Sequence, residues 1–276
     1  MLGAIIGDIV GSRFEFSEDD NRGKDFAFFA STCRATDDSF MTIAIAKALF
    51  LSKGNLEKLH DYAISCMQEV GRDHINTGWG GGFYKWILSS SPKPYQSYGN
   101  GAGMRVSPVG WVSQSEQEVK TLSKIVTQVS HDHEEGLKGA ECVAMGVYLA
   151  RIGKTKQEIR ERLSEYYSIL KDETFTIDSL YGKYGYDDYG NWVTCQGSIP
   201  QAIIAFLESD SFENAVRLAV SIGGDSDTIG AMAGSIAEAY YGIPIELEEK
   251  ALSYLSEDLL TIYYAFNTIK KKRILR

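Results

Sequence analysis

The chain has 276 residues, of which 44% are hydrophobic and 24% are charged, so it can build a large core and global disorder is excluded. Its 28 lysines and arginines against 37 aspartates and glutamates give a net charge of −9 at pH 7. A free-standing nucleic-acid-binding protein normally carries the opposite sign, so binding to unmodified nucleic acid is not expected.

The apolar N-terminal run MLGAIIGDIVG does not fit a secretory signal, because no basic segment precedes it and Asp8 interrupts it. No window approaches the ~18 uninterrupted apolar residues of a membrane span. The four cysteines form no CxxC pair, which argues against a zinc or redox motif and suits free thiols in a reducing compartment. We therefore expect a cytoplasmic protein with no membrane partner.

The periodic segments of the chain are nearly all helical. Ser115 with Glu118, and Thr155 with Glu158, form capping boxes ahead of apolar residues at three- and four-residue steps. Ala- and Leu-rich stretches predict further helices over residues 41–51, 56–70, 136–151, 199–208, 212–221, 228–241 and 257–270. Residues 174–178 are a weak strand candidate. The pattern predicts an all-α globule of about a dozen helices.

Two irregular stretches separate these helices. Residues 89–103 contain two of the five prolines and form the clearest loop. Residues 171–195 are rich in aromatic side chains and too apolar for a linker, so they mark no domain boundary. We expect these aromatics to pack rather than to cap a substrate.

Glu15 follows the apolar N-terminal segment and has phenylalanines on both sides. An apolar setting would raise the pKa of its carboxyl group and suit it to proton transfer. An ordinary exposed loop glutamate explains the same residue, and the spacing alone favours that simpler interpretation.

Thr36, Asp37 and Asp38 open a strongly apolar helix. Thr36 suits an N-cap, and acidic residues in the first turn interact favourably with the helix dipole. Two adjacent acids are more than capping needs, so capping and a metal site explain this motif equally well.

The segment GGDSDT begins another apolar helix and contains Asp225, Asp227 and Thr228. Its glycines permit a tight turn, and its alternating aspartates can direct hard oxygen ligands to one point, as Mg²⁺ or Mn²⁺ requires. With Thr36-Asp37-Asp38 it supplies enough oxygens for two metals that activate water. Since the two motifs lie near opposite ends of the chain, we expect residues 1–276 to form a single domain.

Two glycine-rich loops match neither a Walker nor a Rossmann fingerprint. Such loops can still expose backbone N–H groups to phosphate oxygens. The candidate ligand-binding residues in them are Gly78, Gly80 and Gly81 in the first loop, and Asn100, Gly101, Ala102, Gly103 and Met104 in the second.

The segment Ser130–His133 reads SHDH and precedes a predicted helix. Its two histidines are poorly spaced for one metal ion, so we expect one of them to cap the helix or to contact a ligand. The chain has no GxSxG elbow, so a Ser/His/Asp triad cannot be argued.

Six blocks of this sequence resemble the ADP-ribosylglycohydrolase superfamily, which includes dinitrogenase-reductase-activating glycohydrolase. The resemblance runs almost end to end, and the TDD and GGDSDT motifs in this order are highly specific. The blocks are GAIIGDIVGSRFEF at 3–16, TDDSFMTIAIAKAL at 36–49, GNGAGMRVSPVGW at 99–111, SHDHEEGLKGA at 130–140, IPQAIIAFLES at 199–209 and SIGGDSDTIGAMAGSIAEAYYGIP at 221–244.

The resemblance implies a compact orthogonal multi-helix bundle with a binuclear Mg²⁺ or Mn²⁺ centre. It implies a catalytic acid/base at Glu15, with Asp37 or Asp227 orienting water, and it matches His133 to a histidine near the ligand. The glycine loops would hold the pyrophosphate and ribose of ADP-ribose. The implied metal ligands are Thr36, Asp37, Asp38, Asp225, Asp227 and Thr228.

The implied activity is hydrolysis of the glycosidic bond between ADP-ribose and a modified target, whose acceptor is arginine, serine, a nucleic-acid base or a small metabolite. Cleavage would pass through an oxocarbenium-like state, with the metals holding ribose hydroxyls and polarising a water. The alternatives are an ADP-ribose-binding module, a catalytically silent relative, or a hydrolase of another nucleotide-sugar compound. Gly82 replaces a frequent arginine, and Ala102-Gly103 replaces a common Ser-Ala pair, so substrate choice stays open. No motif specifies oligomeric state, and we expect a monomer.

Overall fold

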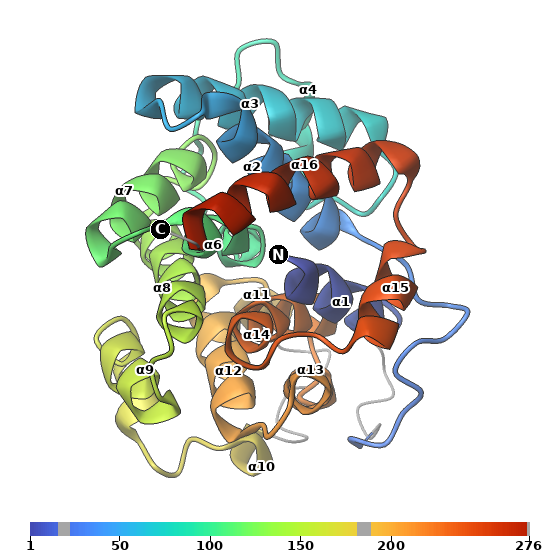
Figure 1. Cartoon of the computed structure of the whole chain (residues 1–276), viewed down its shortest axis with the longest axis vertical. Helices are drawn as coiled ribbons and strands as arrows, with labels where there is room; N and C mark the ends of the chain where they lie inside the picture. Colours follow the sequence, from blue (N-terminus) through green and yellow to red (C-terminus); the bar gives the residue numbers. More distant parts are fainter. Residues whose placement is uncertain (16–22, 181–188, 275–276) are drawn as a thin grey trace.

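The computed structural model describes residues 1–15, 23–180 and 189–274, and within these ranges the chain forms helices and no strand (Figure 1). Gly99 and Thr194 make an isolated antiparallel bridge. The predicted all-α class is therefore confirmed. In the described part of the chain, no helix is long and apolar enough to cross a membrane.

The helices follow one another through short connections. They are α1 (Leu2–Gly11), α2 (Asp37–Ser52), α3 (Leu56–Asp73), α4 (Gly81–Leu88), α5 (Gly101–Met104), α6 (Ser107–Val112), α7 (Glu116–Thr127), α8 (Glu134–Arg151), α9 (Lys156–Leu163), the 3₁₀ helix η1 (Ser168–Lys171), α10 (Ile177–Leu180), α11 (Tyr189–Trp192), α12 (Cys195–Glu208), α13 (Phe212–Ser221), α14 (Ser226–Tyr241), α15 (Ile245–Leu252) and α16 (Glu257–Ile274).

Every segment predicted as helical from periodicity coincides with an observed helix. Thr155 and Glu158 form the complete capping box ahead of α9. Ser115 accepts the Glu118 N–H as predicted, but the Glu118 carboxylate accepts from Gln114 N–H. The weak strand prediction over 174–178 is wrong, because helix α10 begins within that segment.

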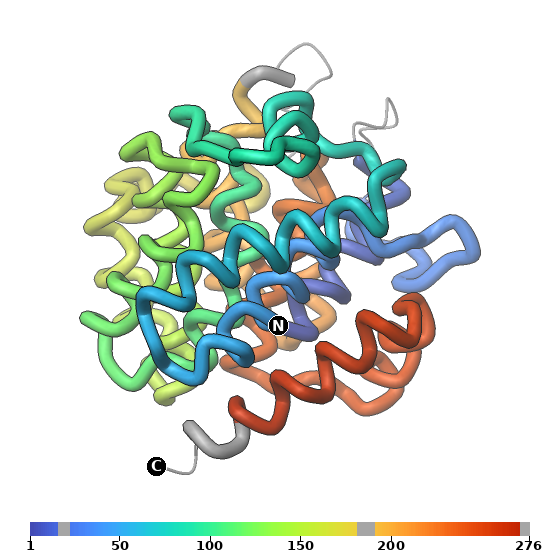
Figure 2. Tube along the Cα trace, turned by 90° about the horizontal axis from the view of Figure 1, so that it is seen from above, coloured from blue at the N-terminus to red at the C-terminus, as the bar shows by residue number. Residues whose placement is uncertain are grey.

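Helix α14 lies at the centre of the molecule, where it packs against α1, α8, α12 and α13 (Figures 1 and 2). Every residue from Ser226 to Glu238 is buried. Helix α2 is the second central element and packs against α3 and α16. The first and last thirds of the chain therefore share one core, and the N-terminal ends of α2 and α14 meet inside it.

Glycines allow α1 and α14 to approach closely. A Cβ atom built on Gly7 would lie 2.0 Å from the Gly230 carbonyl oxygen, and one on Gly3 would lie 2.1 Å from the Gly234 oxygen. No side chain fits between the two backbones at these points. The close packing brings Asp8, on α1, next to the first turn of α14.

Gly7→Ala is therefore expected to lower the free energy of unfolding by about 2–3 kcal/mol, because the new methyl group must push two backbones apart. Gly81→Ala is the matched control, since no atom lies within 4 Å of a Cβ built there. Urea denaturation measures both. Equal stability of Gly7→Ala and the wild type would contradict the close approach of α1 and α14.

Candidate metal centre and adjoining pocket

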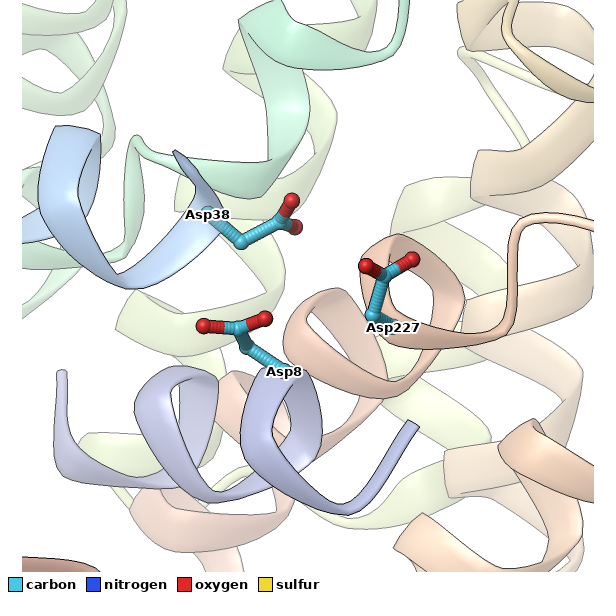
Figure 3. A group of neighbouring side chains, drawn as sticks. All are labelled: Asp8, Asp38 and Asp227. Atoms are coloured by element: carbon cyan, nitrogen blue, oxygen red, sulfur yellow. The ribbon is translucent and has the colours of Figure 1, made fainter. Parts of the chain in front are cut away.

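Carboxylates from three helices face a common space between them (Figure 3). Asp8 comes from α1, Asp38 from the first turn of α2 and Asp227 from the first turn of α14. All three are buried, and each offers an oxygen within 4.8 Å of the other two. Glu15, Asp225 and Asp227 form an overlapping group with the same spacing. The two aspartate motifs from opposite ends of the chain thus meet as the sequence predicts.

The remaining polar groups of the cluster leave one oxygen unsatisfied. Thr228 donates its hydroxyl to Asp38 Oδ2 at 3.1 Å, and Asn100 donates its amide to Asp225 Oδ2 at 2.6 Å. Asp38 Oδ1 is buried without a hydrogen-bond partner among the described residues. A buried carboxylate oxygen of this kind needs a donor or a cation.

Burial raises the pKa values of Asp37, Asp38 and Asp227 well above their ordinary range, and repulsion by neighbouring carboxylates raises them further. The pKa of Glu15 rises to about 7, first through desolvation and then through repulsion by Asp225, while Arg34 opposes the rise. Carboxylates this close cannot all ionise unless a cation compensates them. Hard oxygen ligands in this number suit Mg²⁺ or Mn²⁺.

Asp8 holds the beginning of α2 in place. Its carboxylate accepts the backbone N–H groups of Thr36 at 2.9 Å and Ser39 at 3.1 Å, and it also accepts both hydroxyl groups. Thr36 occupies the N-cap position, yet its side chain makes no capping bond to α2. The sequence shows Asp8 only as an acid inside an apolar helix, and that pattern is the signal by which its structural role could have been found.

The acidic cluster forms one side of a pocket of about 370 Å³, a volume within the usual range for small-molecule sites. Both glycine loops line the same pocket. Of the predicted site residues, it is lined by Glu15, Asp37, Asp38, Gly78, Gly80, Gly81, Asn100, Gly101, Met104, Asp225, Asp227 and Thr228.

Four predicted site residues lie outside the lining of this pocket. Thr36 is buried and bonded to Asp8. Ala102 and Gly103 are buried, and a Cβ on Gly103 would meet Met232 Sδ at 3.0 Å, so both help to pack the core. His133 caps α8 by accepting the Glu135 N–H.

Other pocket residues were missed from the sequence. They are Phe83, Tyr95, Ser97, Gly99, Arg105, His131 and Val193. Gly82 also lines the pocket, and a Cβ at that position would lie 2.9 Å from the Tyr95 ring. The ring therefore occupies the space that a side chain at position 82 would need. Of the SHDH segment, the first histidine lines the pocket and the second caps the helix.

Trp192 supports the turn that carries Asp225. Gly224 has a φ of +63°, and a Cβ there would lie 2.5 Å from the Trp192 ring. The Trp192 carbonyl oxygen accepts from Asn100 Nδ2 at 3.2 Å. This aromatic residue packs beneath the site, whereas Tyr181, Tyr184 and Tyr186 of the same stretch lie outside the described residues.

Three comparisons with known proteins agree with this geometry. A sequence model of the ADP-ribosylglycohydrolase family matches residues 1–267. ADP-ribosylhydrolase ARH3 of Homo sapiens is 26% identical over 94% of this chain and 90% of its own length. ADP-ribosylarginine hydrolase Tri1 of Pseudomonas putida is 24% identical over 91% of this chain and 72% of its own length. A solved structure titled "ADP-ribosylglycohydrolase-related protein complex" has the same fold, with a TM-score of 0.65, 22% identity, and coverage of 98% of this chain and 97% of that chain.

Proposed function

Since the chain belongs to the ADP-ribosylglycohydrolase family, we propose that it is a metal-dependent hydrolase that releases ADP-ribose from a modified acceptor. The observation that carries the proposal is the convergence of both aspartate motifs, both glycine loops and Glu15 on one pocket. These elements come from distant parts of the sequence, and their meeting at one cavity is what a site for a charged, oxygen-rich ligand requires.

The residues proposed to hold two divalent cations are Thr36, Asp37, Asp38, Asp225, Asp227 and Thr228. The unpartnered Asp38 Oδ1 and the mutual repulsion of the carboxylates support this assignment. The Thr36 hydroxyl donates to Asp8 and keeps its oxygen lone pairs available. Mg²⁺ or Mn²⁺ bound here would supply Lewis acidity and offset the buried negative charge.

Glu15 is the proposed acid/base group. Its carboxyl has a pKa of about 7, so it can give or accept a proton near neutral pH. It lies beside Asp227, with an oxygen of each within 4.8 Å of the other. Asp227 or Asp37 would orient the attacking water, and the surrounding carboxylates would stabilise positive charge that develops on the ribose.

The first glycine loop is proposed to contact the diphosphate of the ligand. Cβ atoms built on Gly78, Gly80 and Gly81 would meet no atom within 4 Å, so their backbone is open to a bound group. N–H groups there would offset phosphate charge. This matters because a protein with a net charge of −9 otherwise repels a diphosphate.

The test is incubation of the purified protein with Mg²⁺ or Mn²⁺ and a panel of arginine-, serine- and nucleotide-linked ADP-ribose substrates. Release of ADP-ribose, identified by mass spectrometry, is the expected result. Activity that survives exhaustive chelation would contradict the metal requirement. Calorimetric binding of ADP-ribose without turnover of any substrate would instead identify a binding module, and a different released product would identify another nucleotide-sugar hydrolase.

Glu15→Gln is expected to reduce turnover by about 10²-fold, because the amide cannot exchange a proton with the leaving group or water. Metal affinity, measured by calorimetry, should remain close to that of the wild type. Unchanged turnover with normal metal binding would return Glu15 to the role of an ordinary loop glutamate.

We also propose that residues 1–276 work as one domain and as a monomer, because elements from both ends of the chain complete the pocket within a single copy. The four cysteines are free and buried, which supports a reducing compartment such as the cytoplasm. Sedimentation analysis of the purified chain tests the oligomeric state.

A further inference from the structure

Arg105 is a buried cation without a buried anion beside it. It directly follows α5, its exposed fraction is 1%, and it lines the pocket. Nη2 donates to Ser130 Oγ at 2.8 Å and lies 3.4 Å from His131 Nδ1, and the guanidinium lies 5.3 Å from the centre of the Phe83 ring. Nε has no partner among the described residues. Burial lowers the Arg105 pKa to about 10, so it stays charged at neutral pH.

These contacts decide where the His131 proton lies. An arginine can only donate, so the nitrogen that faces Nη2 must accept. Ser130 Oγ accepts from Arg105 and lies 2.9 Å from His131 Nδ1, so its own proton is free to point to that nitrogen. A proton on Nδ1 would oppose the Arg105 donor. The neutral imidazole with its proton on Nε2 is the form that satisfies all three residues.

The same contacts disfavour the imidazolium, which also carries a proton on Nδ1. Burial, and then the charge of Arg105, hold the pKa of His131 well below its ordinary value. The ring is also fixed in position, because the Phe83 and Tyr95 rings lie 6.2 Å and 5.8 Å from it. His131 is therefore neutral and held in one orientation.

The other ring nitrogen faces the second glycine loop. His131 Nε2 lies 3.3 Å from a Cβ built on Gly101 and 3.7 Å from one built on Gly99, and these residues line the pocket with His131. No residue in the described ranges hydrogen bonds to Nε2. A donor that is fixed in place and unused by the protein is available to a ligand.

We propose that Arg105 is a positioning residue that fixes His131 as a neutral Nε2–H donor to an acceptor oxygen of the ligand. The assignment of that ligand as ADP-ribose rests on the proposed function, whereas the assignment of the tautomer does not. The uncompensated charge of Arg105 favours an anionic oxygen at this position, such as one on a phosphate.

The tautomer is tested by long-range ¹H–¹⁵N correlation spectra of the ¹⁵N-labelled protein. The chain has only four histidines, and His131→Gln assigns the signal by removing it. We expect a protonated Nε2 and an unprotonated Nδ1 from pH 6 to 8 in the wild type. Arg105→Met should yield a mixture of tautomers, whereas an Nδ1–H form or an imidazolium in the wild type at pH 7 would overturn the proposal. The wild-type spectrum decides this even if Arg105→Met does not fold.

The donor role is tested by calorimetry with ADP-ribose in the presence of Mg²⁺. His131→Ala should weaken binding about 10-fold, the usual effect of losing a hydrogen bond to a charged group. His131→Gln, whose amide nitrogen takes the place of Nε2, should recover much of that loss, and His60→Ala on the surface is the control. Equal affinities of the wild type, His131→Ala and His131→Gln would overturn the donor role. The predicted tautomer in a wild type that binds no ADP-ribose would contradict the proposed function and support the Arg105–His131 pairing.

Discussion

Asp38→Asn is expected to reduce turnover by about 10³-fold and to weaken metal binding, while making the metal-free protein more stable than the wild type. The loss of activity follows because a bound metal supplies several kcal/mol of transition-state stabilisation, and each 1.36 kcal/mol is a factor of ten in rate. The gain in stability follows because the substitution removes one of several mutually repelling buried charges.

The two effects are measured on the same variant, turnover and metal affinity with metal present and the unfolding temperature in chelator. The asparagine oxygen can still accept the Thr228 hydroxyl, so the change is one of charge more than of packing. Asp61→Asn is the control, because the side chain of Asp61 is 85% exposed and surface substitutions have small effects. An Asp38→Asn protein with wild-type metal affinity and turnover would exclude Asp38 as a ligand. Lower stability in chelator would contradict the repulsion between carboxylates.

Metal-free protein is expected to lose stability as the pH rises from 5 to 8. Burial and repulsion raise the pKa of Glu15 to about 7, and burial raises that of Asp8 to about 6. Asp38 and Asp227 shift in the same direction. Between the ordinary carboxyl range near 4 and these raised values, the folded protein binds more protons than the unfolded chain. The free energy of unfolding therefore falls with rising pH in this window.

Divalent metal should reverse that trend. Binding to the folded state alone stabilises by about 4 kcal/mol when the metal is a thousand-fold above its dissociation constant. Metal affinity should itself rise with pH, because the ligands must lose their protons. Calorimetric unfolding at pH 5, 6, 7 and 8, in chelator and in Mn²⁺, measures both effects, and Asp38→Asn should show a shallower slope in chelator. An unfolding temperature in chelator that increases from pH 5 to 8 would contradict this account of the acidic cluster.

Local patterns account for most of the helices. The Thr155–Glu158 capping box and the apolar repeat behind it predict α9 because both depend on contacts within one or two turns. The segment 174–178 misled for the same reason: its short apolar pattern fits a strand or a helix equally well. Its helical conformation depends on Glu208, which accepts the Ile177 N–H from a distant helix.

The site was partly readable for a chemical reason. Adjacent or alternating aspartates at the start of an apolar helix are rare without a function, and the two such motifs do meet at one pocket. Asp8, Arg105 and His131 have no comparable local pattern. Each becomes significant only through partners that are remote in the sequence or through burial, such as Thr36 and Ser39 around Asp8.

The sequence by itself determined the all-α class, the positions of the main helices and the residue types that can bind hard metals, because periodicity, capping and ligand chemistry act over a few neighbouring residues. Only the tertiary structure decided which histidine of the SHDH segment faces the pocket, that Asp8 supports α2, and that Arg105 lies buried beside His131. These features depend on how α1, α2, α5 and α14 pack. Burial converts ordinary side chains into groups with raised pKa values or fixed tautomers, because their partners and their access to water are set by the fold.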